Sequence, residues 1–401
     1  MMRKIVLLMT VGTGVGEDKD KKIERLAHGL LSSILHYHPE KIVFFGSEKS
    51  KDTIKSLKKQ YKEETNEEFI NHDFVLISKI DNFDECFLRI RKKVEEYEKD
   101  YEVIIDYTSG TKTMTTAASV CSILYHKKLS LISGNRGKNG IVILGTESVI
   151  EQNLYSAYDK YLFDKFKELF NFYHFTEARN TLDQIVILDE KEKFRNLVDG
   201  YELWDKFDHK SAFEKLSIVK DERVNKNKEF LGRLIREGRT EYILTDLIIN
   251  AERRISEGKY DDAVARLYRA VELISQMKLK EYDLDELSDG KLTIDNLENK
   301  GLDTKKYKDL VDEKGKLKLG LKKKFELLRD LGWDLANPIY FENKNIRELL
   351  SKRNNSILAH GLEPIDRKSA VKLFSEIERI VREMIKDYKD LKDKGSFPKL
   401  L

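Results

Sequence analysis

The sequence predicts an α/β domain, with a mostly parallel sheet and helices on both faces, followed by an all-α domain. Within residues 1–150, short runs of β-branched and aromatic residues alternate with amphipathic stretches, a pattern typical of parallel sheets. Beyond residue 150 the short runs fade and helical periodicity dominates. A chain of 401 residues also exceeds one ordinary hydrophobic core, so we expect more than one domain.

The first 150 residues contain the predicted sheet. Its expected strands are Lys4–Met9, Lys41–Phe45, Asp73–Ser78, Tyr101–Asp106, Leu129–Ser133 and Gly140–Leu144. The helices expected between them are Lys21–Tyr37, Lys51–Tyr61, Phe83–Lys99 and Thr113–Lys127. A Gly-rich segment joins the last two strands, which therefore favours a hairpin there.

The remainder is predicted to be helical in two parts. Residues 151–235 form a connector, and residues 236–401 form the all-α domain. Residues 278–317 are charged and irregular, which predicts a loop-rich insertion. The clearest helices of the last domain are Glu241–Ser256, Tyr260–Met277, Lys318–Leu331, Asn345–Ala359 and Arg367–Tyr388.

Composition limits the classes of partner. Charged residues make up 36% of the chain, but the net charge is only +3, so any contact with RNA must be local and stable DNA binding is not expected. Cys86 and Cys121 lie in apolar helical contexts, which indicates buried thiols in a reducing compartment. The apolar runs are too short to span a bilayer, so we expect a cytoplasmic protein without a membrane partner.

The loop after the first predicted strand has the composition of a ligand site. Ligands of open α/β sheets bind beyond the carboxyl ends of the strands. Here Thr10 and Thr13 offer hydroxyls, while Gly12 and Gly14 permit close approach of a ligand to the backbone. The glycine spacing does not match the dinucleotide fingerprint, which argues against a dehydrogenase.

A second polar loop follows the predicted strand Tyr101–Asp106. The amides at the start of the next helix can bind an anion. The Gly-Thr-Lys-Thr sequence from Gly110 resembles the end of a P-loop, but position 105 is Ile where that motif needs Gly, so ATP hydrolysis is not expected. The alternative is a polar helix cap with a solvated lysine. The candidate ligand residues of this loop are Thr108, Ser109, Gly110, Thr111 and Lys112.

Arg353 and His360 are the candidate catalytic pair. On a helix, residues seven apart share a face, which would direct a permanent cation and a neutral-pH acid/base into one space. This pair suits phosphodiester cleavage by the 2′-OH of RNA, because His can move a proton and Arg can stabilise charge on the phosphorane. The alternative is a solvated Arg and a capping His before Gly361. We expect no metal, because the closest His pair, His36 and His38, has unsuitable spacing.

These features together resemble the CARF–HEPN ribonucleases of type III CRISPR systems, the Csm-type accessory RNase family. CARF is a CRISPR-associated Rossmann-like α/β fold, and HEPN is an all-α fold that often carries a ribonuclease site. The resemblance covers nearly the whole chain. It is carried by Asp106–Met114, by the spacing of Arg353 and His360, and by the segments Tyr260–Glu272 and Leu331–Leu335.

The resemblance implies a homodimer whose CARF domains bind a cyclic oligoadenylate as activator. Tetra-adenylate is preferred over hexa-adenylate, because it is the commoner activator among relatives. The activated HEPN dimer would cleave single-stranded RNA without a metal or other cofactor, using Arg353, His360 and the polar Asn354. Some relatives also cut the cyclic activator in the CARF pocket, where Thr10, Thr13 and Lys112 would act. The expected pocket residues are Thr10, Gly12, Thr13, Gly14, Thr108, Ser109, Gly110, Thr111 and Lys112.

Three other classes of protein were weighed against this interpretation. A non-catalytic CARF ligand sensor that regulates a partner or transcription would need a DNA-binding helix pair, and no compact one is evident. A HEPN toxin would not need the long nucleotide-binding half. A small-molecule α/β enzyme would need a nucleophile, a base and an orienting group, and this set is not evident.

Overall fold

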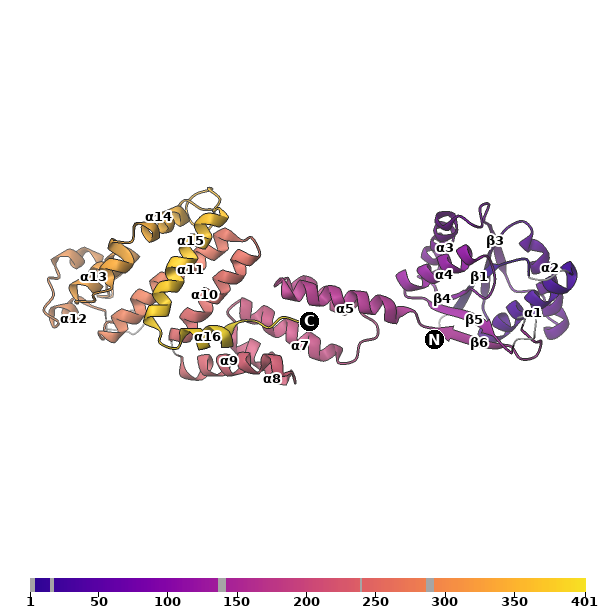
Figure 1. Cartoon of the computed structure of the whole chain (residues 1–401), viewed down its shortest axis with the longest axis horizontal. Coiled ribbons are helices and arrows are strands. Elements are labelled where there is room, and N and C mark those ends of the chain that lie inside the picture. Colours follow the sequence, from indigo (N-terminus) through magenta and orange to yellow (C-terminus); the bar gives the residue numbers. More distant parts are fainter. Residues whose placement is uncertain (1–3, 15–17, 136–141, 239, 286–291) are drawn as a thin grey trace. The chain divides into compact units, whose positions relative to one another are not determined.

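The computed structural model divides into two compact units (Figure 1). Unit 1 comprises Met1–Tyr161 and Ile185–Ile187, and unit 2 comprises Leu162–Gln184 and Leu188–Leu401. The structure describes residues 4–14, 18–135, 142–238, 240–285 and 292–401. The predicted boundaries at residues 150 and 235 stay predictions.

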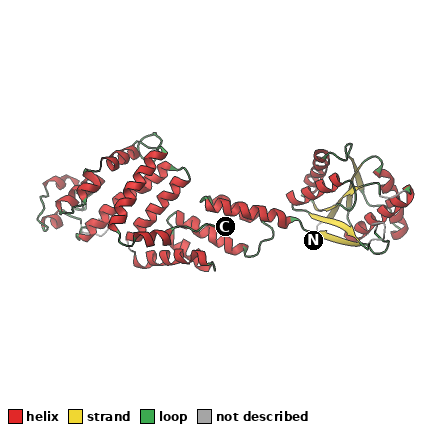
Figure 2. Cartoon of the chain, in the orientation of Figure 1, coloured by secondary structure: helices red, strands yellow, loops and turns green. Residues whose placement is uncertain are grey.

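Unit 1 is built on a six-stranded sheet in the order β3-β2-β1-β4-β5-β6 (Figure 2). The first five of these strands run parallel, and β6 is antiparallel to β5. The strands are β1 (Lys4–Val11), β2 (Lys41–Gly46), β3 (His72–Leu76), β4 (Tyr101–Asp106), β5 (Lys128–Ser133) and β6 (Ser148–Gln152).

Helices cover both faces of this sheet. Successive strand side chains point to opposite faces, so Leu7 and Phe44 pack with α1 and α2, while Leu8 and Phe45 pack with α3 and α4. These four side chains are at most 1% exposed. The helices are α1 (Lys19–Tyr37), α2 (Ser50–Thr65), α3 (Phe83–Tyr97) and α4 (Lys112–Leu124). The predicted fold class, a mostly parallel sheet with helices on both faces, is confirmed.

The predicted hairpin has the wrong second strand. The partner of β5 is β6, in which Ser148 pairs with Ser133, and not the predicted Gly140–Leu144. Residues 140 and 141 lie outside the described residues, and Leu144 lies in a turn. The apolar run that indicated a strand instead lines a cavity through Val142 and Leu144. The edge strand next to β5 is therefore β6, a polar strand with little burial.

Unit 2 is helical, as predicted. The predicted helix Asn345–Ala359 ends early, at Asn354, and Arg367–Tyr388 is divided between two helices. The insertion 278–317 contains only short helices after α11, within its described part. The helices are α5 (Tyr155–Asn171, which begins in unit 1), α6 (Phe175–Gln184), α7 (Lys191–Asp205), α8 (His209–Ile218), η1 (Glu222–Val224), α9 (Asn225–Glu237), α10 (Thr240–Ser256), α11 (Tyr260–Glu281), α12 (Ile294–Glu298), η2 (Lys305–Leu310), α13 (Leu321–Asp330), η3 (Asn337–Phe341), α14 (Lys344–Asn354), α15 (Arg367–Met384) and α16 (Tyr388–Gly395).

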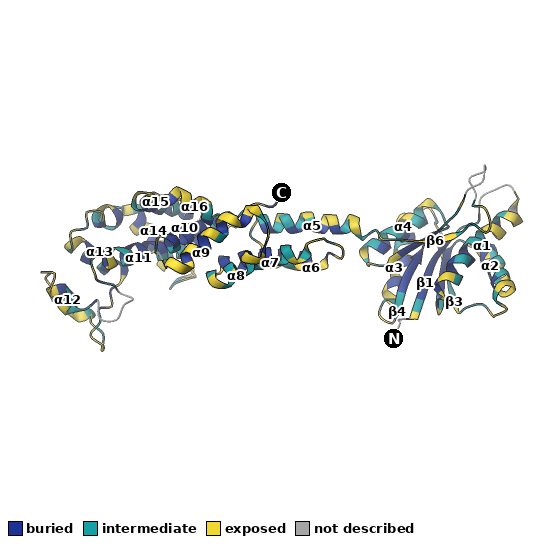
Figure 3. Ribbon diagram, turned by 90° about the horizontal axis from the view of Figure 1, so that it is seen from below, coloured by how far each residue is buried: buried dark blue, intermediate teal, exposed yellow. Residues whose placement is uncertain are grey.

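The segment after α16 ties the early helices of unit 2 to the later ones. Phe397 packs against Tyr201 and Trp204 of α7, with ring centroids 4.6 and 5.0 Å away. The guanidinium carbon of Arg253, on α10, lies 3.9 Å from the centroid of the Phe397 ring. Asn227 of α9 donates to the carbonyl of Lys394, within α16, at 2.8 Å and to that of Ser396, in this segment, at 2.9 Å. The buried interior that results is dark blue in Figure 3.

We expect Phe397→Ala to destabilise unit 2 by about 3–5 kcal/mol, because the removed ring is 8% exposed and leaves a cavity beside Trp204. Hydrogen exchange of α7 and α10 amides in the full chain measures this loss. Leu401→Ala is the control, since that side chain is fully exposed. Equal protection in the two variants would contradict the packing role of Phe397.

Candidate functional site

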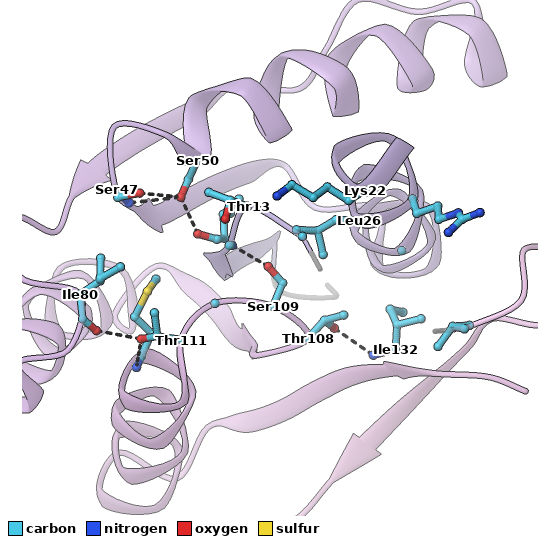
Figure 4. Close-up of a pocket in the computed structure, with 18 of the residues that line it drawn as sticks. Thr13, Lys22, Leu26, Ser47, Ser50, Ile80, Thr108, Ser109, Thr111 and Ile132 are labelled. Carbon is cyan, nitrogen blue, oxygen red and sulfur yellow. Dashed lines mark hydrogen bonds between the residues drawn. The ribbon is translucent and has the colours of Figure 1, made fainter. Parts of the chain in front are cut away.

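A cavity of about 490 Å³ lies at the carboxyl end of the unit 1 sheet (Figure 4). The loops after β1, β2 and β4 supply much of its wall, and α1 supplies one side. This is the edge at which open α/β sheets bind ligands. Its volume falls within the ordinary range of ligand pockets.

Seven of the nine predicted ligand residues line this cavity: Gly12, Thr13, Gly14, Thr108, Ser109, Gly110 and Thr111. The other two do not. Thr10 is only 1% exposed, and its hydroxyl donates to the carbonyl of Ser109. Lys112 is exposed at the start of α4 and is absent from the cavity wall. The two loops were therefore located correctly, but the direction of these two side chains was not. That the seven bind a ligand stays a prediction.

Hydrogen bonds between backbone and side-chain groups hold the two loops together, and their backbones approach closely. The Gly12 amide donates to Oγ of Ser109 at 2.7 Å. A Cβ at Gly12 would lie only 3.1 Å from the nitrogen of Gly110, and Gly110 itself has a φ of +114°. Glycine is thus required at this close approach. Because the Ser109 hydroxyl accepts from Gly12, its own hydrogen can be donated to a bound group.

Helix α1 contributes cations that sequence reasoning missed. Lys22, Arg25, Leu26 and Gly29 all line the cavity. They are spaced three and four residues apart, so they share one helical face. This spacing was available in the sequence, since all four residues lie within the predicted helix Lys21–Tyr37. Among the described residues neither Lys22 nor Arg25 has an acidic partner within salt-bridge distance, which leaves both charges available to an anion.

The connection between β5 and β6 brings a carboxylate to the same cavity. Glu147 lines it, and its side chain is 8% exposed. Nδ1 of His28 lies 3.1 Å from Oε1 of Glu147. A carboxylate accepts hydrogen bonds from amino and hydroxyl groups and repels phosphate. The cavity wall therefore has both basic and acidic parts.

Asp106 stands below the cavity at the end of β4. Its carboxylate accepts from the Thr108 amide at 2.9 Å and from the Ser33 hydroxyl at 2.5 Å. The residue is fully buried, and this burial raises the pKa of its carboxyl above the ordinary value of 3.8, against the effect of those hydrogen bonds.

In unit 2, Arg353 and His360 do not share a helix. Helix α14 ends at Asn354, so the predicted placement of both residues on one helical face is wrong. The Ser356 hydroxyl donates to the Arg353 carbonyl at 2.8 Å, and the Ser356 amide bonds the same carbonyl at 3.1 Å. Asn and Ser compete in this way with helical hydrogen bonding, which explains why the helix stops here.

The chain nevertheless returns His360 to the end of α14. The His360 amide donates to the Asn354 carbonyl at 3.1 Å, and the Gly361 amide donates to the Ser356 carbonyl at 3.2 Å. A Cβ at Gly361 would lie 2.0 Å from the oxygen of Asn355, which only glycine avoids. His360 and Asn354 are exposed, so both can reach a substrate.

Arg353 is half-buried, and its guanidinium lies against an aromatic ring. Its Cζ is 4.5 Å from the centroid of the Tyr268 ring, and Nη1 donates to Oδ1 of Asn354 at 3.3 Å. The two predicted site residues on α14 are thus in contact. Within the described ranges, no group of three or more His, Cys, Asp or Glu side chains could hold a metal ion. No helix among those residues is long and apolar enough to cross a bilayer.

Comparison with protein-family models gave two matches from one family. The model of the Csm6 HEPN domain matches residues 233–385, and the model of the Csm6 6H domain matches residues 158–242. Together they extend over more than half of the chain. The chain belongs to the Csm6 family. The Csm6 HEPN match includes Arg353, Asn354 and His360, and the predicted relationship to CARF–HEPN ribonucleases is confirmed.

Solved structures extend the likeness to the whole chain. Enterococcus italicus Csm6 bound to cyclic hexa-2′-fluoro-hexa-dAMP has a TM-score of 0.69 and 15% identity, over 98% of each chain. At this identity the likeness shows the fold alone, including the α/β unit that the two family models do not cover. Can2 from Sulfobacillus thermosulfidooxidans, in complex with cyclic tetra-adenylate, has a TM-score of 0.26 and 12% identity, over 46% of this chain and 54% of its own. A score this low supports no argument. Comparison with curated protein sequences gave no match.

The raised pKa of Asp106 predicts a pH-dependent stability of unit 1. A carboxyl whose folded pKa is raised stabilises the fold below its unfolded value of 3.8 and loses that contribution as pH rises through the folded pKa. We therefore expect Asp106→Asn to gain stability relative to the wild type as pH rises above the unfolded value of 3.8. Hydrogen exchange of β4 amides at several pH values measures this difference in stability. The exposed Asp100→Asn is the control; a difference that stays constant with pH would contradict the assignment.

Proposed function

We propose that this chain is an endoribonuclease that cleaves single-stranded RNA at Arg353 and His360 when a cyclic oligoadenylate occupies the cavity of unit 1. The carrying observation is the Csm6 HEPN match, which includes both residues. The supporting observation is the cavity, whose wall combines cations, hydroxyls and a carboxylate. The active form is a homodimer, in which Arg353 and His360 of both copies form one composite site.

The cleavage uses the substrate's own nucleophile. The 2′-oxygen of the RNA forms a bond to the adjacent phosphorus, and the bond from phosphorus to the 5′-oxygen breaks. His360 transfers the proton of the attacking or the leaving oxygen, and Arg353 stabilises the charge that grows on the non-bridging oxygens. The products are a 2′,3′-cyclic phosphate and a 5′-hydroxyl. Because attack is intramolecular, the reaction needs no metal-bound water.

The activator is matched by the groups in the cavity. Lys22 and Arg25 suit phosphate, the Ser109 hydroxyl can donate, and Glu147 can accept from an amino or hydroxyl group. Two such cavities about a two-fold axis would present each group twice, as a ring of identical nucleotides requires. The solved Csm6 structure from Enterococcus italicus holds a cyclic nucleotide of six units. Our preference for cyclic tetra-adenylate stays a prediction, and the RNA cleavage assay includes both cyclic tetra-adenylate and cyclic hexa-adenylate.

Cleavage of the activator within the cavity remains an expectation from the family resemblance. Thr10 cannot take the part expected of it, because its hydroxyl is buried and donates to the Ser109 carbonyl. Of the three residues expected to act there, Thr13 is the one that lines the cavity. Incubating labelled activator with the His360→Ala variant tests this activity separately from RNA cleavage.

The ribonuclease assignment predicts that His360→Ala and Arg353→Ala each lower RNA cleavage at least about a hundredfold, because each removes a group from the reacting centre. The assay uses a fluorescent single-stranded RNA in excess EDTA, with no activator, cyclic tetra-adenylate or cyclic hexa-adenylate. His174→Ala, an exposed His elsewhere in unit 2, is the control. Full activity of His360→Ala would refute the site, and dependence on added metal would refute the metal-free mechanism.

The cavity predicts a contrast between two cations of unit 1. Arg25→Ala should weaken binding of the cyclic oligoadenylate by about tenfold or more, because a charge-assisted hydrogen bond to phosphate is lost. Lys112→Ala should leave binding within about twofold, because Lys112 lies outside the cavity wall. Isothermal titration with both rings measures the two affinities. The opposite ranking would place the binding site at the start of α4 instead.

A further inference from the structure

We propose that Tyr268 is a positioning residue for RNA cleavage, which holds the guanidinium of Arg353 in place through the face of its ring. The inference rests on the proposed function, because it takes Arg353 as the group that meets the phosphate. It adds to that proposal a residue of a different helix, α11, eighty-five positions away in the sequence. It also specifies the physical interaction through which that residue acts.

The contact between the two side chains is direct. Cζ of Arg353 lies 4.5 Å from the centroid of the Tyr268 ring, within the distance of about 6 Å at which a cation is attracted to an aromatic face. Nε of Arg353 is buried and has no hydrogen-bond partner among the described residues. Among the described residues, the one hydrogen bond of its guanidinium is to Asn354, at 3.3 Å, which is long. The Tyr268 ring is the second contact of this guanidinium.

A comparison within unit 2 shows why this anchor matters. Arg253 and Arg254 on α10 both pair with the carboxylate of Asp205, at 2.9 and 2.6 Å, and Arg254 also pairs with Glu257 at 2.7 Å, so two carboxylates offset the two charges. Arg353 has no carboxylate within 4.0 Å among the described residues. An aromatic face orients a guanidinium without cancelling its charge. The full charge and the Nη donors then remain available for a phosphate oxygen.

Tyr268 itself stands against a packed aromatic group. Burial, followed by the nearby phenol of Tyr268, raises the pKa of Tyr340 in η3 above its ordinary value, which indicates that the two phenols are neighbours. The Tyr340 ring stacks on that of Phe325 with centroids 4.9 Å apart, and Phe325 is fully buried. Leu267, next to Tyr268 on α11, is also fully buried. The helix that carries Tyr268 is therefore anchored in the interior of unit 2.

The test compares Tyr268→Leu with Tyr268→Phe in the full, activated chain. Leucine removes the aromatic face and keeps an apolar side chain, so we expect kcat to fall about tenfold while KM for RNA stays within about twofold. Phenylalanine keeps the face, so we expect it to retain at least about half of wild-type kcat. Tyr260→Leu is the matched control, because Tyr260 lies on the same helix and, among the described residues, no cation stands over its ring.

The possible outcomes separate the inference from the function on which it rests. If Arg353→Ala is inactive but Tyr268→Leu has wild-type kcat, the positioning role is refuted and the function stands. If Tyr268→Phe loses as much as Tyr268→Leu, the hydroxyl and not the ring face is responsible, which also refutes it. If Arg353→Ala remains active, the proposed function fails and the inference fails with it. A fall in kcat with Leu alone, at an unchanged melting temperature, supports the role.

Discussion

The buried side chain of Asp106 links two walls of the unit 1 cavity. Asp106 ends the strand β4, between β1 and β5, and it is fully buried. Its two oxygens accept from Thr108, which begins the polar loop, and from Ser33 on α1, which forms another wall of the cavity. One group thereby fixes the positions of two walls. The desolvation of that group opposes the fold, and the two hydrogen bonds offset part of this cost.

The two candidate sites place their cationic side chains in different ways. In unit 1, Lys22 and Arg25 gather beside a backbone made compact by glycine, so the charge comes from a helix and the close approach from the loops. In unit 2, the guanidinium of Arg353 lies over the ring of Tyr268, 4.5 Å from its centroid, a contact that brings no counter-charge. Among the described residues, none of these three cations has a carboxylate within salt-bridge distance, although Glu147 lines the same cavity as Lys22 and Arg25.

The sequence predicted strands and helices well, because their periodicity is visible in the sequence. It did not predict the direction of loop side chains. Five of the predicted strands and the fold class agree with the structure, because buried strands and amphipathic helices have clear patterns. The strand Gly140–Leu144 was wrong, because an apolar run can line a cavity as well as a sheet. Thr10 and Lys112 belong to the right loops, yet no sequence pattern indicates which loop side chains turn inward. The end of α14 was missed because hydrogen bonds of Ser356, and not a glycine or proline, terminate it.

The position of His360 beyond the end of α14 has a consequence for how such a site can evolve. On a helix, one inserted or deleted residue turns everything after it by about 100°, so a catalytic pair on one helix would be destroyed by any change of spacing. His360 is instead returned to Asn354 by backbone hydrogen bonds of a loop. A loop can gain or lose a residue and still close on the same helix end. The spacing of Arg353 and His360 in the sequence could therefore change by a residue without separating the two proposed site residues in space.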